Sequence, residues 1–174
     1  MLKRISCLAF SLVFGVAASG LVNTTQVQAL SDQQIDVIKS NCQSSQVILK
    51  QIQLSDVATR ISRGRDYQQL IKLMATFNSR LALNKIDGGQ LTSITADMEN
   101  QFNDFQQTYI TYSDQLSSLI SLDCQDQPTE FYDQLNAARD LRLDLAKEVD
   151  TMDKLLDEYQ QGVDDIAQQL SAES

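Results

Sequence analysis

The chain has 174 residues, of which 43% are hydrophobic, a size that suits one ordinary domain with an apolar core. It contains one proline and six glycines, and this scarcity favours long helices over a β-rich fold. The formal net charge of −9 repels nucleic-acid phosphates and anionic lipids, so we expect neither nucleic acid nor an anionic membrane surface as a partner. The expected fold class is all-α.

Residues 1–29 have the layout of a secretory signal peptide. Two basic residues come first, residues 5–22 are apolar, and a polar stretch ends in a small residue, Ala29. We predict cleavage after Ala29 and export to the periplasm, the cell surface or the medium. Cys7 precedes the end of the apolar stretch, so it is not the acylated cysteine of a lipoprotein. The alternative is an uncleaved anchor, although the apolar stretch is near the lower limit for a membrane span.

The first helix of the mature chain is expected over residues 31–84, where apolar residues recur every three or four positions. Ser31 and Gln34 form a capping-box pattern at its start. Gly64 lowers the helix propensity of the middle by about 1 kcal/mol relative to alanine. We favour a helix that is continuous through Gly64, with a kink there as the alternative. Asn84 is expected to take the left-handed conformation that closes the helix.

The second helix is expected over residues 88–122 and carries the most regular apolar stripe of the chain. Asp87 and Gln90 form a second capping-box pattern before it. The connection is short, so the first two helices should be antiparallel neighbours. The stripe is expected to be buried by both other helices and consists of Leu91, Ile94, Met98, Phe102, Phe105, Tyr109, Tyr112, Leu116 and Leu119.

The third helix is expected over residues 129–171. Pro128 is well placed at its first turn, where the missing N–H of proline costs nothing. The three helices should form an elongated antiparallel three-helix coiled-coil bundle, a single domain over residues 30–174. The first helix is longer than the second, so its start should overhang the second helix. This overhang carries a possible interaction strip of Ile35, Ile38 and Val47; the alternative is that the loop at Cys124 covers it.

Cys42 and Cys124 are the two cysteines of the mature chain. An even pair in an exported protein indicates a disulfide. The expected helix ends place Cys124 within reach of Cys42, and such a bond would stabilise the fold by about 4 kcal/mol. Two free thiols, or a link between two chains, are the alternatives.

The sequence contains no histidine, which removes the usual general base and most transition-metal sites. We therefore expect no enzymatic activity and no cofactor. The carboxylates of the last helix form a solvated acidic face rather than a Ca²⁺ site, because no calcium-loop motif accompanies them. The basic cluster of Arg60, Arg63 and Arg65 is expected to pair with this acidic helix, with docking of an acidic partner surface as the alternative. Tyr109 and Tyr112 are expected in the core rather than as a ligand-stacking platform.

The positions of Cys42, the turn at 87–90, Cys124 and Pro128 together resemble small uncharacterised exported coiled-coil proteins of candidate-phyla bacteria. The outline is also similar to exported helical chaperones that hold unfolded outer-membrane proteins, which tend to be basic where this chain is acidic.

These observations predict a non-enzymatic structural or adaptor protein that contacts another protein, or a second copy, at the cell envelope or surface. No stable membrane span is expected after signal cleavage. The alternative is a periplasmic or surface chaperone-like holder that uses the gap between the helix tips as an apolar clamp.

Overall fold

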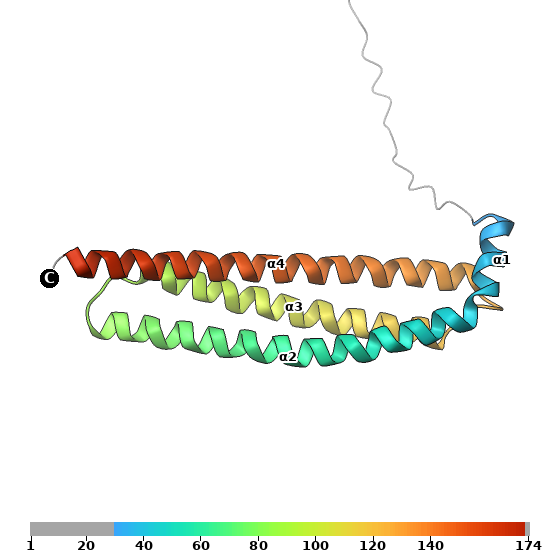
Figure 1. Ribbon diagram of the computed structural model, residues 1–174, viewed down its shortest axis with the longest axis horizontal. Helices are drawn as coiled ribbons and strands as arrows, with labels where there is room; N and C mark the ends of the chain where they lie inside the picture. Colours follow the sequence, from blue (N-terminus) through green and yellow to red (C-terminus); the bar gives the residue numbers. More distant parts are fainter. Residues whose placement is uncertain (1–29, 173–174) are drawn as a thin grey trace, which may run out of the picture.

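The computed structural model describes residues 30–172, and the predicted signal peptide at 1–29 lies outside the described residues. The described chain is helical and contains no strand, so the all-α prediction is confirmed. Three long helices lie side by side and alternate in direction, and a short helix turns across one end (Figure 1). In chain order the helices are α1 (Asp32–Ser40), α2 (Cys42–Leu83), α3 (Gly89–Ser121) and α4 (Pro128–Ala172).

The prediction of one helix over 31–84 is wrong, because the helix is divided at Asn41. The carbonyl of Val37 accepts from the side-chain amide of Asn41 at 2.9 Å and from the hydroxyl of Ser40 at 3.0 Å. Side chains that compete for a helical carbonyl in this way favour a bend. Downstream of this break α2 is continuous through Gly64, as expected.

The capping box predicted at Ser31 and Gln34 is present at the start of α1. The predicted box of Asp87 and Gln90 is absent. The N-cap of α3 is Gly88 and not Asp87, so Gln90 is one position too early to close a box. The Asp87 carboxylate instead accepts from the backbone N–H of Gly89 at 3.0 Å.

Lys85, and not Asn84, takes the left-handed conformation that ends α2, with a φ of 57°. The Ile86 N–H donates to the Leu81 carbonyl at 2.9 Å, and the Lys85 N–H donates to the Ala82 carbonyl at 3.1 Å. This pair of bonds is a Schellman motif, which satisfies carbonyls that the helix end would leave without partners.

The core is organised around α3, whose predicted stripe is confirmed: all nine of its side chains are buried. α3 packs against both α2 and α4 along its length. A polar cluster near the α2–α3 turn adds to the register. The Tyr159 hydroxyl donates to Asn78 at 2.9 Å, the Asn78 amide donates to the Thr95 hydroxyl at 2.8 Å, and this hydroxyl donates to the Leu91 carbonyl at 2.8 Å.

The predicted disulfide between Cys42 and Cys124 is present, with the two Cα atoms 5.5 Å apart. It joins the α1–α2 break to the connection between α3 and α4. The Gln125 side chain in that connection donates to the Lys39 carbonyl of α1 at 2.9 Å. α1 contacts the start of α4, so the extended overhang predicted for the first helix does not form.

No helix within residues 30–172 combines the length and the apolarity needed to cross a bilayer.

Candidate functional site

The inward face of α2 changes character halfway along the helix. α2 buries Cys42 and Leu49 near its start, and Tyr67, Met74 and Leu81 toward its end. No α2 residue between Leu49 and Tyr67 is buried. After Ile52, the α2 side chains that line the gap between α2 and α4 are polar: Asp56, Thr59, Arg60 and Arg63. Because charged groups cannot be packed against an apolar neighbour without a large desolvation cost, α2 and α4 leave a groove here.

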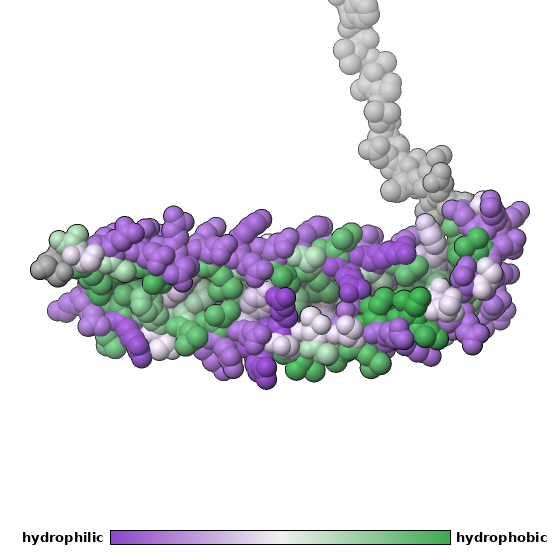
Figure 2. Space-filling view, viewed as in Figure 1, coloured by the Kyte–Doolittle hydropathy of each residue, from purple (hydrophilic) through white to green (hydrophobic). Residues whose placement is uncertain are grey.

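This α2–α4 groove has α3 as its floor and contains two open pockets. The first pocket, of about 280 Å³, has Ile48, Leu49 and Ile52 of α2 on one side and Phe131 and Leu135 of α4 on the other. The second pocket, of about 340 Å³, is described below. Tyr112 and Arg142 line both pockets, so the two are halves of one groove. Figure 2 shows hydrophobic surface between the polar edges of α4 and α2.

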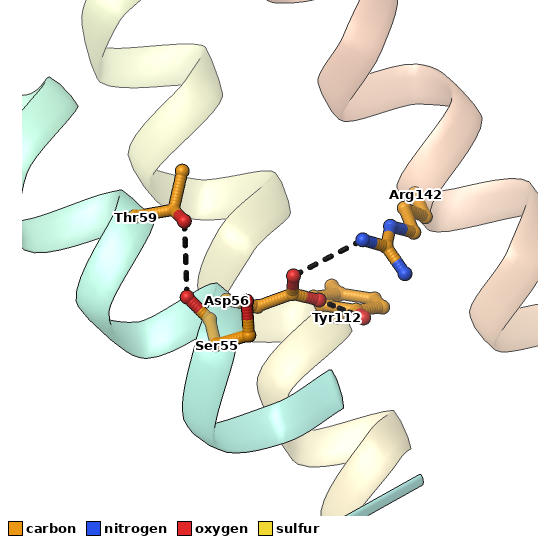
Figure 3. Close-up of polar contacts among 5 residues, drawn as sticks. All are labelled: Ser55, Asp56, Thr59, Tyr112 and Arg142. Carbon is orange, nitrogen blue, oxygen red and sulfur yellow. Dashed lines mark hydrogen bonds and ion pairs between the residues drawn. The ribbon is translucent and has the colours of Figure 1, made fainter. Parts of the chain in front are cut away.

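A polar bridge crosses the groove between the two pockets and joins all three long helices (Figure 3). Asp56 of α2 accepts from the Tyr112 hydroxyl of α3 at 2.6 Å and from the Arg142 guanidinium of α4 at 3.1 Å. The Asp56 side chain is 18% exposed and that of Arg142 is 54% exposed, so the bridge is open to solvent on the arginine side.

Burial raises the pKa of the Tyr112 hydroxyl, and the hydrogen bond to Asp56 acts in the same direction. The hydroxyl therefore stays protonated at neutral pH and acts as a fixed donor. A tyrosine held in this state serves to position a carboxylate rather than to abstract a proton.

The second pocket combines aromatic and cationic groups. Its apolar wall includes Phe105 and Tyr109 of α3 and Leu145 of α4. The Arg60 guanidinium lies 4.7 Å from the centroid of the Tyr109 ring, a cation–π geometry that holds this arginine at the lip of the groove. Burial raises the pKa of Tyr109, while the charge of Arg60 acts against that shift.

The charge of the groove is opposite to that of the chain. Its lining includes two aspartates, Asp56 and Asp150, and four of the six arginines that occur in residues 30–172; it includes none of the lysines. The arginines are Arg60 and Arg63 on α2, and Arg139 and Arg142 on α4. A positive groove on a chain with a net charge of −9 favours an anionic occupant.

The predicted pairing of Arg60, Arg63 and Arg65 with the acidic last helix is wrong: within residues 30–172, none of the three forms an ion pair. The ion pair that joins these helices has the opposite polarity, with Arg142 on α4 and Asp56 on α2. Sequence periodicity does not reveal this pair, because the two residues are 86 positions apart in the chain and meet only through the register between α2 and α4.

The residues of the predicted interaction strip lie on two helices. Ile35 and Ile38 are half-buried on α1, and Ile38 packs against the core, whereas Val47 on α2 is 52% exposed. The strip prediction missed two apolar side chains that follow Val47 at intervals of seven residues, Leu54 and Ile61, which are 73% and 62% exposed. The seven-residue spacing was the signal that could have identified them.

Tyr109 and Tyr112 are both buried, as the sequence indicated. The carboxylates of α4 do not gather: among the described residues, no group of three or more potential metal ligands occurs.

Comparisons with known protein families, with curated proteins and with solved structures found no match for the chain. The chemistry of the groove is therefore the basis for assigning a function.

Proposed function

We propose that the protein is an exported, non-enzymatic adaptor whose α2–α4 groove receives a helix of a partner protein at the cell envelope or surface. In this proposal α2, α3 and α4 form an antiparallel three-helix coiled coil, and the partner helix lies as a fourth element between α2 and α4. The Cys42–Cys124 disulfide supports an oxidising compartment.

The dimensions of the groove are the observation that carries this proposal. It extends from Ser45 to Arg63 along α2, which is roughly 27 Å at 1.5 Å per residue. A helix of about 18 residues has this length. An apolar floor between polar lips is the arrangement in which amphipathic helices bind, with their apolar face down and their polar face in water.

The groove chemistry favours binding over catalysis. The sequence has no histidine, and the Tyr112 hydroxyl is held in its protonated form beside Asp56. An arrangement of this kind has donors and acceptors that orient a ligand, and it has no histidine to serve as a general acid or base.

Site-specific photo-crosslinking in the native cells tests the adaptor function. A photoreactive amino acid at Ile48 or Ala146, one in each pocket, should capture the same protein, and the same label at Lys72 on the outer face of α2 should not. Equal capture at all three positions, or no capture at the groove positions, would contradict the proposal.

A chaperone-like holder is the second candidate, and the exposed apolar stripe of Val47, Leu54 and Ile61 favours it. A holder would suppress the aggregation of unrelated unfolded proteins, and replacing Leu54 and Ile61 with serine would remove that activity. An adaptor would leave the aggregation of such clients unchanged.

A further inference from the structure

We infer that the occupant of the α2–α4 groove is an acidic amphipathic helix of a partner protein, bound by arginines on both lips. This inference rests on the adaptor function proposed above and names the chemistry of the partner.

The lip arginines are held in place but keep free donors. Arg60 lies over the Tyr109 ring, Arg139 donates to the Asn136 side chain at 3.2 Å, and Arg142 donates to Asp56. A guanidinium has five N–H donors, so each of these contacts leaves donors for a carboxylate of the occupant. Arginine binds carboxylates in a two-pronged geometry that lysine cannot reproduce, which accounts for the importance of arginine rather than lysine at this groove.

The two pockets define a spacing for the apolar residues of the partner. Leu135 in the first pocket and Ala146 in the second are 11 residues apart on α4, or roughly 16 Å. Eleven residues are close to three helical turns, so two apolar pairs with this offset lie on one face of the partner helix. We expect apolar residues at i and i+4, and again at i+11 and i+15.

The polar bridge determines which type of residue the partner helix should have between its two apolar pairs. The i+7 position faces Asp56, Tyr112 and Arg142, and only Arg142 has an exposed side chain with unused donors. Glutamate at i+7 would accept from Arg142, whereas an apolar residue there would cover the remaining N–H donors of Arg142 and leave them without acceptors. Further acidic residues on both flanks of the partner helix would reach Arg60 on one lip and Arg139 on the other.

Binding of synthetic peptides to the whole protein, with its disulfide intact, tests this inference. The first peptide is a helix of about 18 residues with leucine at i, i+4, i+11 and i+15, and glutamate at i+7 and on the flanks. The second has lysine in place of every glutamate. Fluorescence anisotropy should show that the glutamate peptide binds to the protein and that the lysine peptide does not. Equal binding of the lysine peptide would overturn the inference.

Charge reversal on the protein provides a matched pair of variants. R60E/R139E reverses one arginine on each lip and should weaken binding of the glutamate peptide by about tenfold or more. K72E/K154E changes the net charge by the same amount at two exposed positions outside the groove and should have a much smaller effect. Equal weakening by both variants would mean that only the overall charge matters, and would overturn the inference.

The shape of the groove is tested without changing its charge. Ala146→Trp places a large side chain at the exposed edge of the second pocket and should abolish binding, with circular dichroism showing an unchanged helical content. A peptide whose two leucine pairs are nine residues apart should bind no better than the lysine peptide. Unchanged binding in either case would contradict the predicted spacing.

Two other possible occupants of the groove would give different experimental results. If the protein dimerises without peptide and Ala146→Trp makes it monomeric, the occupant is a second copy. If phosphatidylglycerol vesicles displace the peptide and R60E/R139E no longer binds them, the occupant is an anionic lipid. Either result overturns the inference. Specific crosslinking at Ile48 and Ala146 combined with failure of the glutamate peptide would leave the adaptor function standing and remove only the acidic-helix assignment.

Discussion

Gly64 in α2 and Gly162 in α4 occupy helix interiors with opposite surroundings, so the same substitution should have opposite effects. A Cβ atom at Gly64 would meet no atom within 4 Å. A Cβ atom at Gly162 would lie 2.6 Å from Cδ2 of Leu91, a side chain that is only 1% exposed. Gly162 therefore allows the close approach of α4 to the first turn of α3, whereas Gly64 has no comparable role.

Replacing either glycine with alanine raises helix propensity by about 1 kcal/mol. Gly64→Ala should keep that gain, and the free energy of unfolding should rise by about 1 kcal/mol. Gly162→Ala must also displace the buried Leu91, and overpacking of this kind costs about 1 to 3 kcal/mol. The net change should lie between about zero and a loss of 2 kcal/mol, so the two variants should differ by about 1 to 3 kcal/mol.

Urea unfolding followed by far-ultraviolet circular dichroism measures both free energies, with the disulfide intact. A double-mutant cycle locates the effect: in a Leu91→Ala background the close contact is gone, so Gly162→Ala should become stabilising. Equal stabilisation by Gly64→Ala and Gly162→Ala in the native background would refute the close packing of α4 on α3 at Leu91.

Three further predictions concern the disulfide, the end of α2 and the tyrosine bridge. C42A/C124A removes a link between residues 82 positions apart and should lower the free energy of unfolding by about 4 to 5 kcal/mol. Reduction of the native protein should reproduce that loss. A urea transition that dithiothreitol does not change would contradict this prediction. Lys85→Gly should raise the thermal midpoint through a gain of about 1 kcal/mol, because Lys85 has a φ of 57° that glycine adopts without strain; a lower midpoint would count against the Schellman motif. Tyr112→Phe should lose about 1.5 kcal/mol at neutral pH through the missing hydrogen bond to Asp56. The stabilisation linked to the raised pKa of Tyr112 is complete below the ordinary tyrosine value of 10.0, and it is lost as the pH rises through the raised pKa. The difference in free energy of unfolding between the native protein and Tyr112→Phe should therefore become smaller in alkali. A difference that is constant with pH would contradict the burial of this hydroxyl.

Local patterns determined much of this architecture. The α3 stripe repeats every three or four residues and was predicted residue by residue, because a helix buried on one face needs only this periodicity. The Ser31–Gln34 capping box is likewise a contact within four residues. The disulfide followed from compartment and from the approximate ends of the helices, since two cysteines need only come within several ångströms.

The tertiary structure decided the features that depend on contacts between distant segments. The break at Asn41 lets α1 turn onto α4. The helical periodicity of residues 31–84 gives no sign of this break, because it continues across Asn41. The groove exists because Asp56 and the arginines of α2 face α4 at a particular register. If α4 shifted along α2 by one helical turn, a residue other than Arg142 would lie opposite Asp56. Helical periodicity is set by neighbours three and four residues away and can be read along the chain, whereas the charge and shape of the groove arise from side chains that only the folded chain brings together.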